Sequence, residues 1–336
     1  MTSSSPRATL NKILLFHEWE WILTENLFFS LNATMPVFLL MLIGFFLHKT
    51  PLLDDRFAGK LNTFVFTVAL PVQLFKNLSE ADFQSVWDGK TVLFCFVISL
   101  ISILIARAVS MTLKDRSLRA EFTQSSYRSS QALLGAALLQ NIYGGTGPLA
   151  LFLIGAVPLY NVAAVILLTL MAPDGRLNRK TLVKTLKGIV TNPIILGIAV
   201  GLLWSILRLP QPTIFRTTIS GVASTATPLG LIALGASIDL KKIAGCLKPV
   251  FLSATFKLVV FVALFLPLAV ALGFRNEHLV ATLVMLGSPT TVSVFSMARS
   301  MGHDGTLSSG AVMLTTLLSS FTFTVWLFLL KTLSLV

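Results

Sequence analysis

The sequence predicts an all-α integral membrane protein of ten transmembrane helices, arranged as two inverted five-helix repeats. Of its 336 residues, 54% are hydrophobic and only 12% are charged, about half the charged fraction of a typical soluble domain. The apolar residues come in runs of about 20, the length of a helix that crosses the hydrocarbon core. These runs do not alternate in polarity as outer-membrane barrel strands do. A soluble enzyme and a disordered chain are thereby excluded.

Ten apolar segments define the predicted spans. They are residues 27–47, 58–77, 91–111, 122–142, 148–171, 189–207, 217–238, 248–273, 277–300 and 306–331. The fourth is the weakest, because glutamine, serine and arginine residues crowd its start. We retain it because removing one span would break the alternation of basic and non-basic loops.

Prolines and glycines recur in the same order in the two halves of the chain. Three pairs are each 157 residues apart: Pro36 and Pro193, Gly44 and Gly201, Pro71 and Pro228. Gly135 and Gly287 are 152 apart, and Tyr143-Gly144 and Met301-Gly302 are 158 apart. Because each repeat has an odd number of spans, the second must enter from the opposite side, as in many secondary transporters. We expect structural roles for Pro36, Pro71, Asn192, Pro193 and Pro228.

The lysines and arginines predict the topology. With both termini on the non-cytoplasmic side, the inside loops hold 17 of them, Arg128 included, and the outside segments hold 8. The chain then divides into an N-terminal interfacial segment (1–26), a first repeat (27–171), a basic cytoplasmic linker (172–188) and a second repeat (189–336). The net charge of +12 reflects this topology rather than nucleic-acid binding.

The ninth span contains the clearest interruption, Gly287-Ser288-Pro289-Thr290-Thr291. Proline is best tolerated in the first turn of a helix and serine is a good N-cap, so the motif predicts the start of a second half-helix inside the membrane. The N-terminus of that half-helix would favour an anion. A plain proline kink is the alternative. The matching part of the fourth span offers Ser130, Gln131 and Gly135 without a proline.

Lys257 is a charged residue inside the eighth span. Such a lysine compensates the charge of a substrate or replaces a coupling cation; snorkelling to the interface is the alternative. No carboxylate lies deep in a predicted span, which disfavours a carboxylate-driven proton or sodium antiporter. The spans hold no paired carboxylates, no serine–histidine arrangement and no metal-ligand spacing, so we expect no enzyme, cofactor or metal.

The chain resembles the auxin efflux carrier family: the PIN-type carriers and their bacterial relatives, which include proposed malate and malonate permeases. The resemblance covers nearly the whole chain. Its residues are 191–197, Pro228-Leu229, Lys257-Leu258, Gly287-Ser288-Pro289-Thr290-Thr291, Met297-Ala298-Arg299, and Tyr143-Gly144 after Gly135. It implies a bile-acid-symporter/PIN-like fold in which broken helices 4 and 9 cross at the substrate site. It also implies a scaffold of helices 1, 2, 6 and 7, a moving domain of helices 3–5 and 8–10, an elevator mechanism and a homodimer.

The fourth helix departs from the family pattern of an asparagine followed by G-x-P. Ser130 stands where the asparagine would be, and Ala137 stands where the proline would be. The ligand specificity of plant members therefore does not transfer to this chain.

The resulting hypothesis is a secondary active or potential-driven carrier of small organic anions in a cell (inner) membrane. Half-helix residues Gly287 to Thr291 would bind the substrate on one side, Ser130, Gln131, Gly135 and Ala137 on the other, with Lys257 supplying charge. Proton or sodium coupling stays open. The competing hypotheses are a sodium-coupled bile-acid-type symporter, which requires sodium, and a membrane sensor, which binds ligand without flux.

Overall fold

The computed structural model describes residue 24 and residues 27–28, 31–32, 34–80, 88–130, 138–140, 142–144, 148–171, 188 and 190–336. Most of the expected N-terminal segment 1–26 and linker 172–188 lies outside these residues. So do three of the expected site residues, Gln131, Gly135 and Ala137.

The described residues form helices joined by turns, and six helices are long and apolar enough to cross a membrane. These are Asp55–Ser79, α4 (Gly89–Ser110), α7 (Leu149–Leu170), α10 (Thr213–Ala236), Leu247–Ala271 and α16 (Thr306–Thr332). Two shorter apolar helices are Thr34–Leu47 and α9 (Pro193–Ile206). The expected multi-pass, all-helical membrane protein is confirmed to this extent.

Two of the long helices each contain one π-helical turn. The first consists of α2 (Asp55–Phe64), η1 (Val65–Ala69) and α3 (Leu70–Ser79). The second consists of α12 (Leu247–Thr255), η2 (Phe256–Val260) and α13 (Phe261–Ala271), and follows the short α11 (Leu240–Gly245). A π-turn frees a main-chain carbonyl and often marks a functional site. Here Trp326 Nε1 donates to the carbonyl of Leu258 in η2 at 3.1 Å.

Local sequence explains where several helices begin. The Asp54 carboxylate accepts from the N–H of Phe57 at 2.7 Å and caps α2. Asp88 caps α4 in the same way. Asn192 accepts from the N–H of Ile194, and Pro193 follows as the first residue of α9, where proline lacks only an N–H that would be unpaired anyway.

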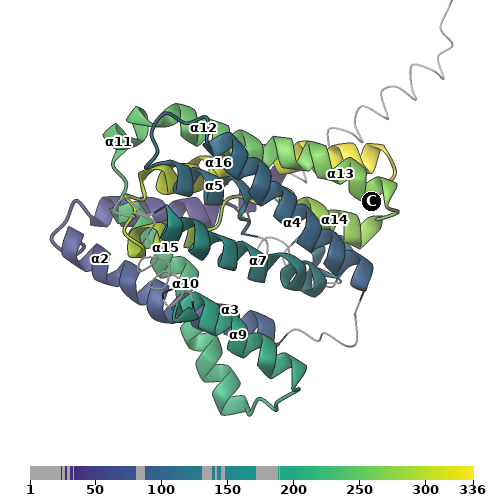
Figure 1. The fold of residues 1–336 in the computed structure, drawn as a ribbon, viewed down its shortest axis with the longest axis horizontal. Helices are drawn as coiled ribbons and strands as arrows, with labels where there is room; N and C mark the ends of the chain where they lie inside the picture. The colour runs from purple at the N-terminus through teal and green to yellow at the C-terminus, as the bar shows by residue number, and fades with distance from the viewer. Residues whose placement is uncertain are drawn as a thin grey trace, which may run out of the picture.

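The helices pack as two groups (Figure 1). One group contains Thr34–Leu47, α2, α3, α9 and α10. The other contains α4, α5 (Arg119–Tyr127), α7, α12, α13, α14 (Asn276–Gly287) and α16. The short α15 (Ser293–Ser300) contacts both groups, since it packs on α2, η1 and α10 as well as on α5 and α16.

Glycines allow the backbones of the first group to approach closely. A Cβ added to Gly44 would lie 2.2 Å from the carbonyl oxygen of Ile232, and one added to Gly201 would lie 2.9 Å from that of Phe75. Small residues at such crossings are typical of membrane helices. Gly44 and Gly201 are 157 residues apart, and so are Phe75 and Ile232. Residues related by the sequence repeat therefore make related contacts.

Two helices of the second group stop inside the protein. α5 ends at Tyr127, and Arg128 is extended (φ −76°, ψ 134°). α14 ends at Gly287, and Ser288 is extended (φ −61°, ψ 150°). The first break begins at Arg128 and the second at Ser288, which are 160 residues apart. The pairing of Gly135 with Gly287 in the sequence repeat has an offset of 152, so that pairing does not align the two breaks. Gly287 serves packing: an added Cβ would lie 3.1 Å from Val262.

Candidate functional site

Hydrogen bonds to main-chain carbonyls join the two broken helices. The N–H of Ser130 donates to the carbonyl of Pro289 at 2.9 Å. Thr290 Oγ1 donates to the carbonyl of Ser125 at 2.8 Å, and Gln124 Nε2 donates to that of Val294 at 3.1 Å. Backbone that leaves a helix inside a membrane must find partners in protein or in a water-filled cavity. Residues 128–130 and 288–292 supply some of these partners to each other.

Lys257, in the π-helical turn η2, contacts both broken helices. Only 1% of its surface is exposed, so the snorkelling alternative does not describe it. Its ammonium donates to Ser129 Oγ at 2.5 Å and to the carbonyl of Leu286. Leu286 lies in the last turn of α14, and the carbonyl end of a helix carries a partial negative charge that favours a cation.

Arg128 is a second buried cation, 2% exposed. Its Nη2 donates to Asn161 Oδ1 and to Ser293 Oγ, both at 2.7 Å, and thereby connects the first break to α7 and to the start of α15. Its Nη1 lies 2.9 Å from Met297 Sδ and 3.4 Å from Gln124 Oε1. No described residue accepts a hydrogen bond from its Nε–H. All of its partners in the described part of the chain are neutral.

Neither buried cation has an acidic partner in the described part of the chain. Arg128 and Lys257 form no ion pair there, and of the described acidic residues only Glu121 is buried. Glu121 accepts instead from two main-chain N–H groups at the start of α16. Buried charges are normally paired, because taking an unpaired charge out of water costs several kcal/mol. The arrangement therefore has room for a negative ligand.

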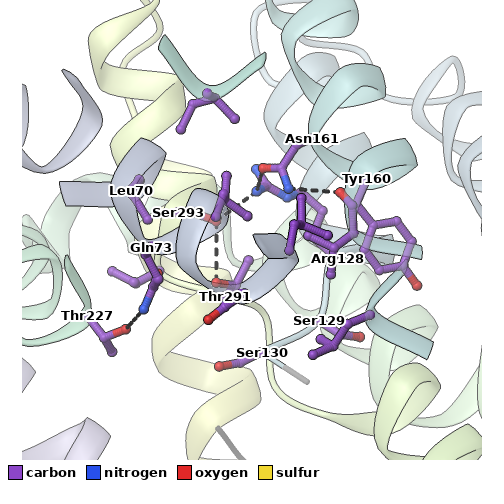
Figure 2. Close-up of a pocket in the computed structure, with 17 residues that line it drawn as sticks. Leu70, Gln73, Arg128, Ser129, Ser130, Tyr160, Asn161, Thr227, Thr291 and Ser293 are labelled. Atoms are coloured by element: carbon purple, nitrogen blue, oxygen red, sulfur yellow. Dashed lines mark hydrogen bonds between the residues drawn. The ribbon is translucent and has the colours of Figure 1, made fainter. Parts of the chain in front are cut away.

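Two cavities lie against the break segments. The smaller, of about 90 Å³, is lined by Arg128, Ser129, Tyr160 and Asn161 together with residues of α3. Figure 2 shows Arg128, Asn161 and Ser293 grouped in this cavity, with Gln73 and Thr227 at its other side. The larger, of about 450 Å³, lies between Thr34–Leu47, α10, α16 and the second break. Five residues line both: Gln73, Ser130, Thr227, Thr291 and Val292.

The expected site residues divide into two sets. Ser130 and Thr291 line both cavities, and Pro289 and Thr290 line the larger one. Ser288 is fully buried, and its hydroxyl donates back to the carbonyl of Val284 at 2.6 Å. It therefore ends the first half-helix instead of capping the second, which begins five residues later at Ser293; the expected N-cap was wrong.

The prolines expected to be structural also differ in position. Pro36 and Pro228 lie in helices that line the larger cavity and are themselves part of its wall. Pro71 follows η1, and its carbonyl oxygen would lie 2.5 Å from a Cβ added to Gly197.

Sequence reasoning missed Arg128, which it had counted among the inside-loop charges. The signal was present, because Arg128 falls within the predicted fourth span and an intramembrane cation is a candidate site residue. Gln73 and Asn161 also line the smaller cavity, and as single amides within apolar spans they gave only a weak signal. Thr227 and Tyr160 carried no signal, since single hydroxyl residues are common in membrane helices.

Comparison with known proteins gives three findings. A model of the family described as "Membrane transport protein" matches residues 29–180 and 175–327. A "Putative malonate transporter" of Rhizobium meliloti (strain 1021) is 26% identical over 315 residues, covering 89% of this chain and 95% of the relative. An "Uncharacterized transporter" of Methanothermobacter thermautotrophicus is 21% identical over 304 residues, covering 88% and 97%.

A solved structure, that of the sodium proton antiporter of Methanocaldococcus jannaschii at pH 8, has a similar fold. It superimposes with a TM-score of 0.59 and 15% identity, covering 94% of this chain and 99% of the antiporter. At this identity the likeness concerns the fold alone.

Proposed function

Because the chain belongs to the membrane transport protein family, the auxin efflux carrier family that its sequence resembles, we propose that it carries small organic anions with carboxylate groups. Family and relatives make it a multi-pass membrane transporter rather than an enzyme. The family alone does not identify the cargo. The proposal of an anion depends on the site.

One observation carries the proposal: two buried cations sit at the crossing of the breaks, and neither has an acidic partner among the described residues. Arg128 lines the smaller cavity, and Lys257 reaches it through Ser129. A carboxylate is the natural partner of a guanidinium, because planar Arg can donate two hydrogen bonds to it. The hydroxyls of Ser130 and Thr291 would supply further donors. The name of the Rhizobium relative agrees with a carboxylate cargo.

Alternating access is proposed to follow the inverted-repeat plan, with ten spans and both termini on the non-cytoplasmic side. The matched glycine contacts support the repeat. So do Gly144 and Gly302, which are 158 residues apart and both have positive φ (73° and 86°) after a broken helix. The packing of the helices as two groups supports an elevator, in which α4, α5, α7, α12–α14, α15 and α16 move against the others. The homodimer implied by the resemblance stays part of this proposal.

Purified protein in liposomes tests the proposal. Liposomes loaded with unlabelled malonate, malate or indole-3-acetate are diluted into the same labelled anion, and exchange is followed over time. The uncharged analogue malonamide serves as the matched control. We expect saturable exchange of at least one carboxylate and none of malonamide. Exchange that requires sodium would favour the bile-acid-type symporter. Binding without exchange, in folded protein, would favour the sensor and contradict the carrier.

A further inference from the structure

A second buried polar cluster lies at the far end of α5 from the crossing. Glu121 on α5 is 1% exposed. Its Oε1 accepts from the N–H of Gly305 at 2.8 Å, and its Oε2 accepts from the N–H of Ser308 at 2.9 Å. α16 begins after Gly305, which has no side chain to cap it. The carboxylate of α5 thus satisfies two of the N–H groups that a helix start leaves unpaired.

His303 completes this cluster. It is 4% exposed, and its Nε2 lies 2.9 Å from the carbonyl oxygen of Leu168 on α7. A carbonyl oxygen only accepts, so Nε2 carries the hydrogen and the lone pair of the neutral ring is on Nδ1. That nitrogen is buried and has no hydrogen-bond partner among the described residues. His303 is two residues from Gly305, whose N–H donates to Glu121. A buried, unpaired basic nitrogen in the same turn that a buried carboxylate binds is a place for a proton.

We propose that Glu121 and His303 form a proton-binding site, which takes up one proton with each transported anion. The proton adds to the unpaired His303 Nδ1, and the pair then changes from one negative charge to none. The inference rests on the proposed function, because it names the coupling ion of the same carrier. The burial of both residues follows from the packing of the helices and cannot be seen in the sequence.

The position of the cluster connects it to the anion site. Glu121 lies on α5, and Arg128 follows the last residue of that helix, seven positions later; Leu168 and Asn161 are seven residues apart on α7. Two helical turns, about 10 Å, thus separate the two sites along the same two helices. A bound dianion carries two negative charges, which Arg128 and Lys257 neutralise. The charge of Glu121 then remains, so the loaded protein has one net negative charge in this region. One proton at the cluster removes it, which lowers the cost of moving the loaded site through the membrane.

Other titratable or charged groups around Glu121 are accounted for. They lie on the elements packed against α5 or next to them: Arg107, Lys114, Asp115, Arg119, Lys242, Cys246, Lys248, Lys257, Arg299 and Asp304. None forms an ion pair with Glu121 in the described part of the chain. Asp304 pairs with Lys242 at 3.5 Å and is half exposed.

The test uses full-length protein in liposomes with two readouts. Counterflow of malonate at equal pH measures the carrier, and accumulation of malonate under an inward proton gradient at zero voltage measures coupling. The variants are Glu121→Gln and His303→Gln, which keep size and hydrogen bonding but bind no proton. Asp304→Asn is the matched control, since it removes a carboxylate from the same turn.

Wild type and Asp304→Asn should accumulate malonate, up to about tenfold for one pH unit and one proton per anion. Glu121→Gln and His303→Gln should keep counterflow but lose accumulation. Accumulation by both variants at the wild-type level overturns the proton site. A wild type that shows counterflow but does not accumulate malonate under the proton gradient overturns it as well.

Should wild type show no counterflow, the proposed function fails, and thermal unfolding still decides on the proton site. Across a pH series, the unfolding temperature of wild type should vary with pH more than that of Glu121→Gln, which lacks the carboxylate of the site. Equal profiles overturn the site.

Discussion

Replacing Arg128 by glutamine separates a binding role from a structural one. The guanidinium makes two hydrogen bonds of 2.7 Å, to Asn161 Oδ1 and Ser293 Oγ. Asn161 Oδ1 loses its hydrogen-bond donor, which lowers the free energy of unfolding by about 1–3 kcal/mol. The substitution also removes a buried positive charge, whose desolvation had destabilised the folded protein by several kcal/mol. These effects oppose each other, so we expect only a small change in unfolding temperature. Anion binding has no such compensation. Loss of one partner of a buried charge pair costs about 2–4 kcal/mol, or roughly a 30- to 700-fold weaker Kd.

The assay is titration of malonate into purified protein by calorimetry, with unfolding temperature measured on the same samples. Arg107→Gln is the matched control. Arg107 is half-buried at the end of α4, donates to Ser110 Oγ at 3.0 Å and lines neither cavity, so its loss should leave Kd unchanged. Arg128→Lys keeps the charge but loses the fork of donors, and should fall between the two. A wild-type Kd in Arg128→Gln would refute the assignment of Arg128 to the anion site.

Three further outcomes follow from the same contacts. Lys257→Met should abolish malonate counterflow while the protein still inserts, because the ammonium joining the two breaks is lost; counterflow within twofold of wild type would contradict this. Gly44→Ala should lower the unfolding temperature, because its Cβ would lie 2.2 Å from Ile232 O, whereas Gly59→Ala meets nothing within 4 Å and should not. The pKa of Asp88 is below its usual range because a threonine hydroxyl donates to it. Its cap therefore stabilises the protein above about pH 4 and is lost as pH falls, so Asp88→Asn should flatten the acid side of the unfolding profile.

Spans could be predicted from the sequence because they depend on composition and length. The expected span 91–111 corresponds to α4, and 306–331 corresponds to α16, with ends that differ by a few residues. Lys257 was also predictable, since a charge within an apolar run has few explanations. The matched glycines Gly44 and Gly201 could be found in the sequence because glycines that allow close helix contacts cannot be replaced by larger residues without steric conflict.

The positions of the breaks could not be predicted in the same way. Nothing in the local sequence ends α5 at Tyr127, because serine and glutamine are compatible with a helix. The break exists where Ser130 and Thr290 find partners on the opposite segment, and such partners are set by tertiary packing. The N-cap expected at Ser288 failed for a related reason: its hydroxyl found a carbonyl in the preceding turn. Burial of Arg128 and Glu121 is likewise a property of the assembled helices.

The placement of the two cations bears on how a carrier both binds and releases its cargo. Arg128 follows the last residue of α5, and Lys257 donates to a carbonyl in the last turn of α14. Each helix end carries about half a negative charge, so together they offset about one of the two positive charges. If aspartates neutralised both positive charges, the site would not attract an anion. If nothing offset these charges, the empty site would be too costly to bury. A site that keeps about one net positive charge would attract the proposed carboxylate without trapping it, as the proposed alternating access requires.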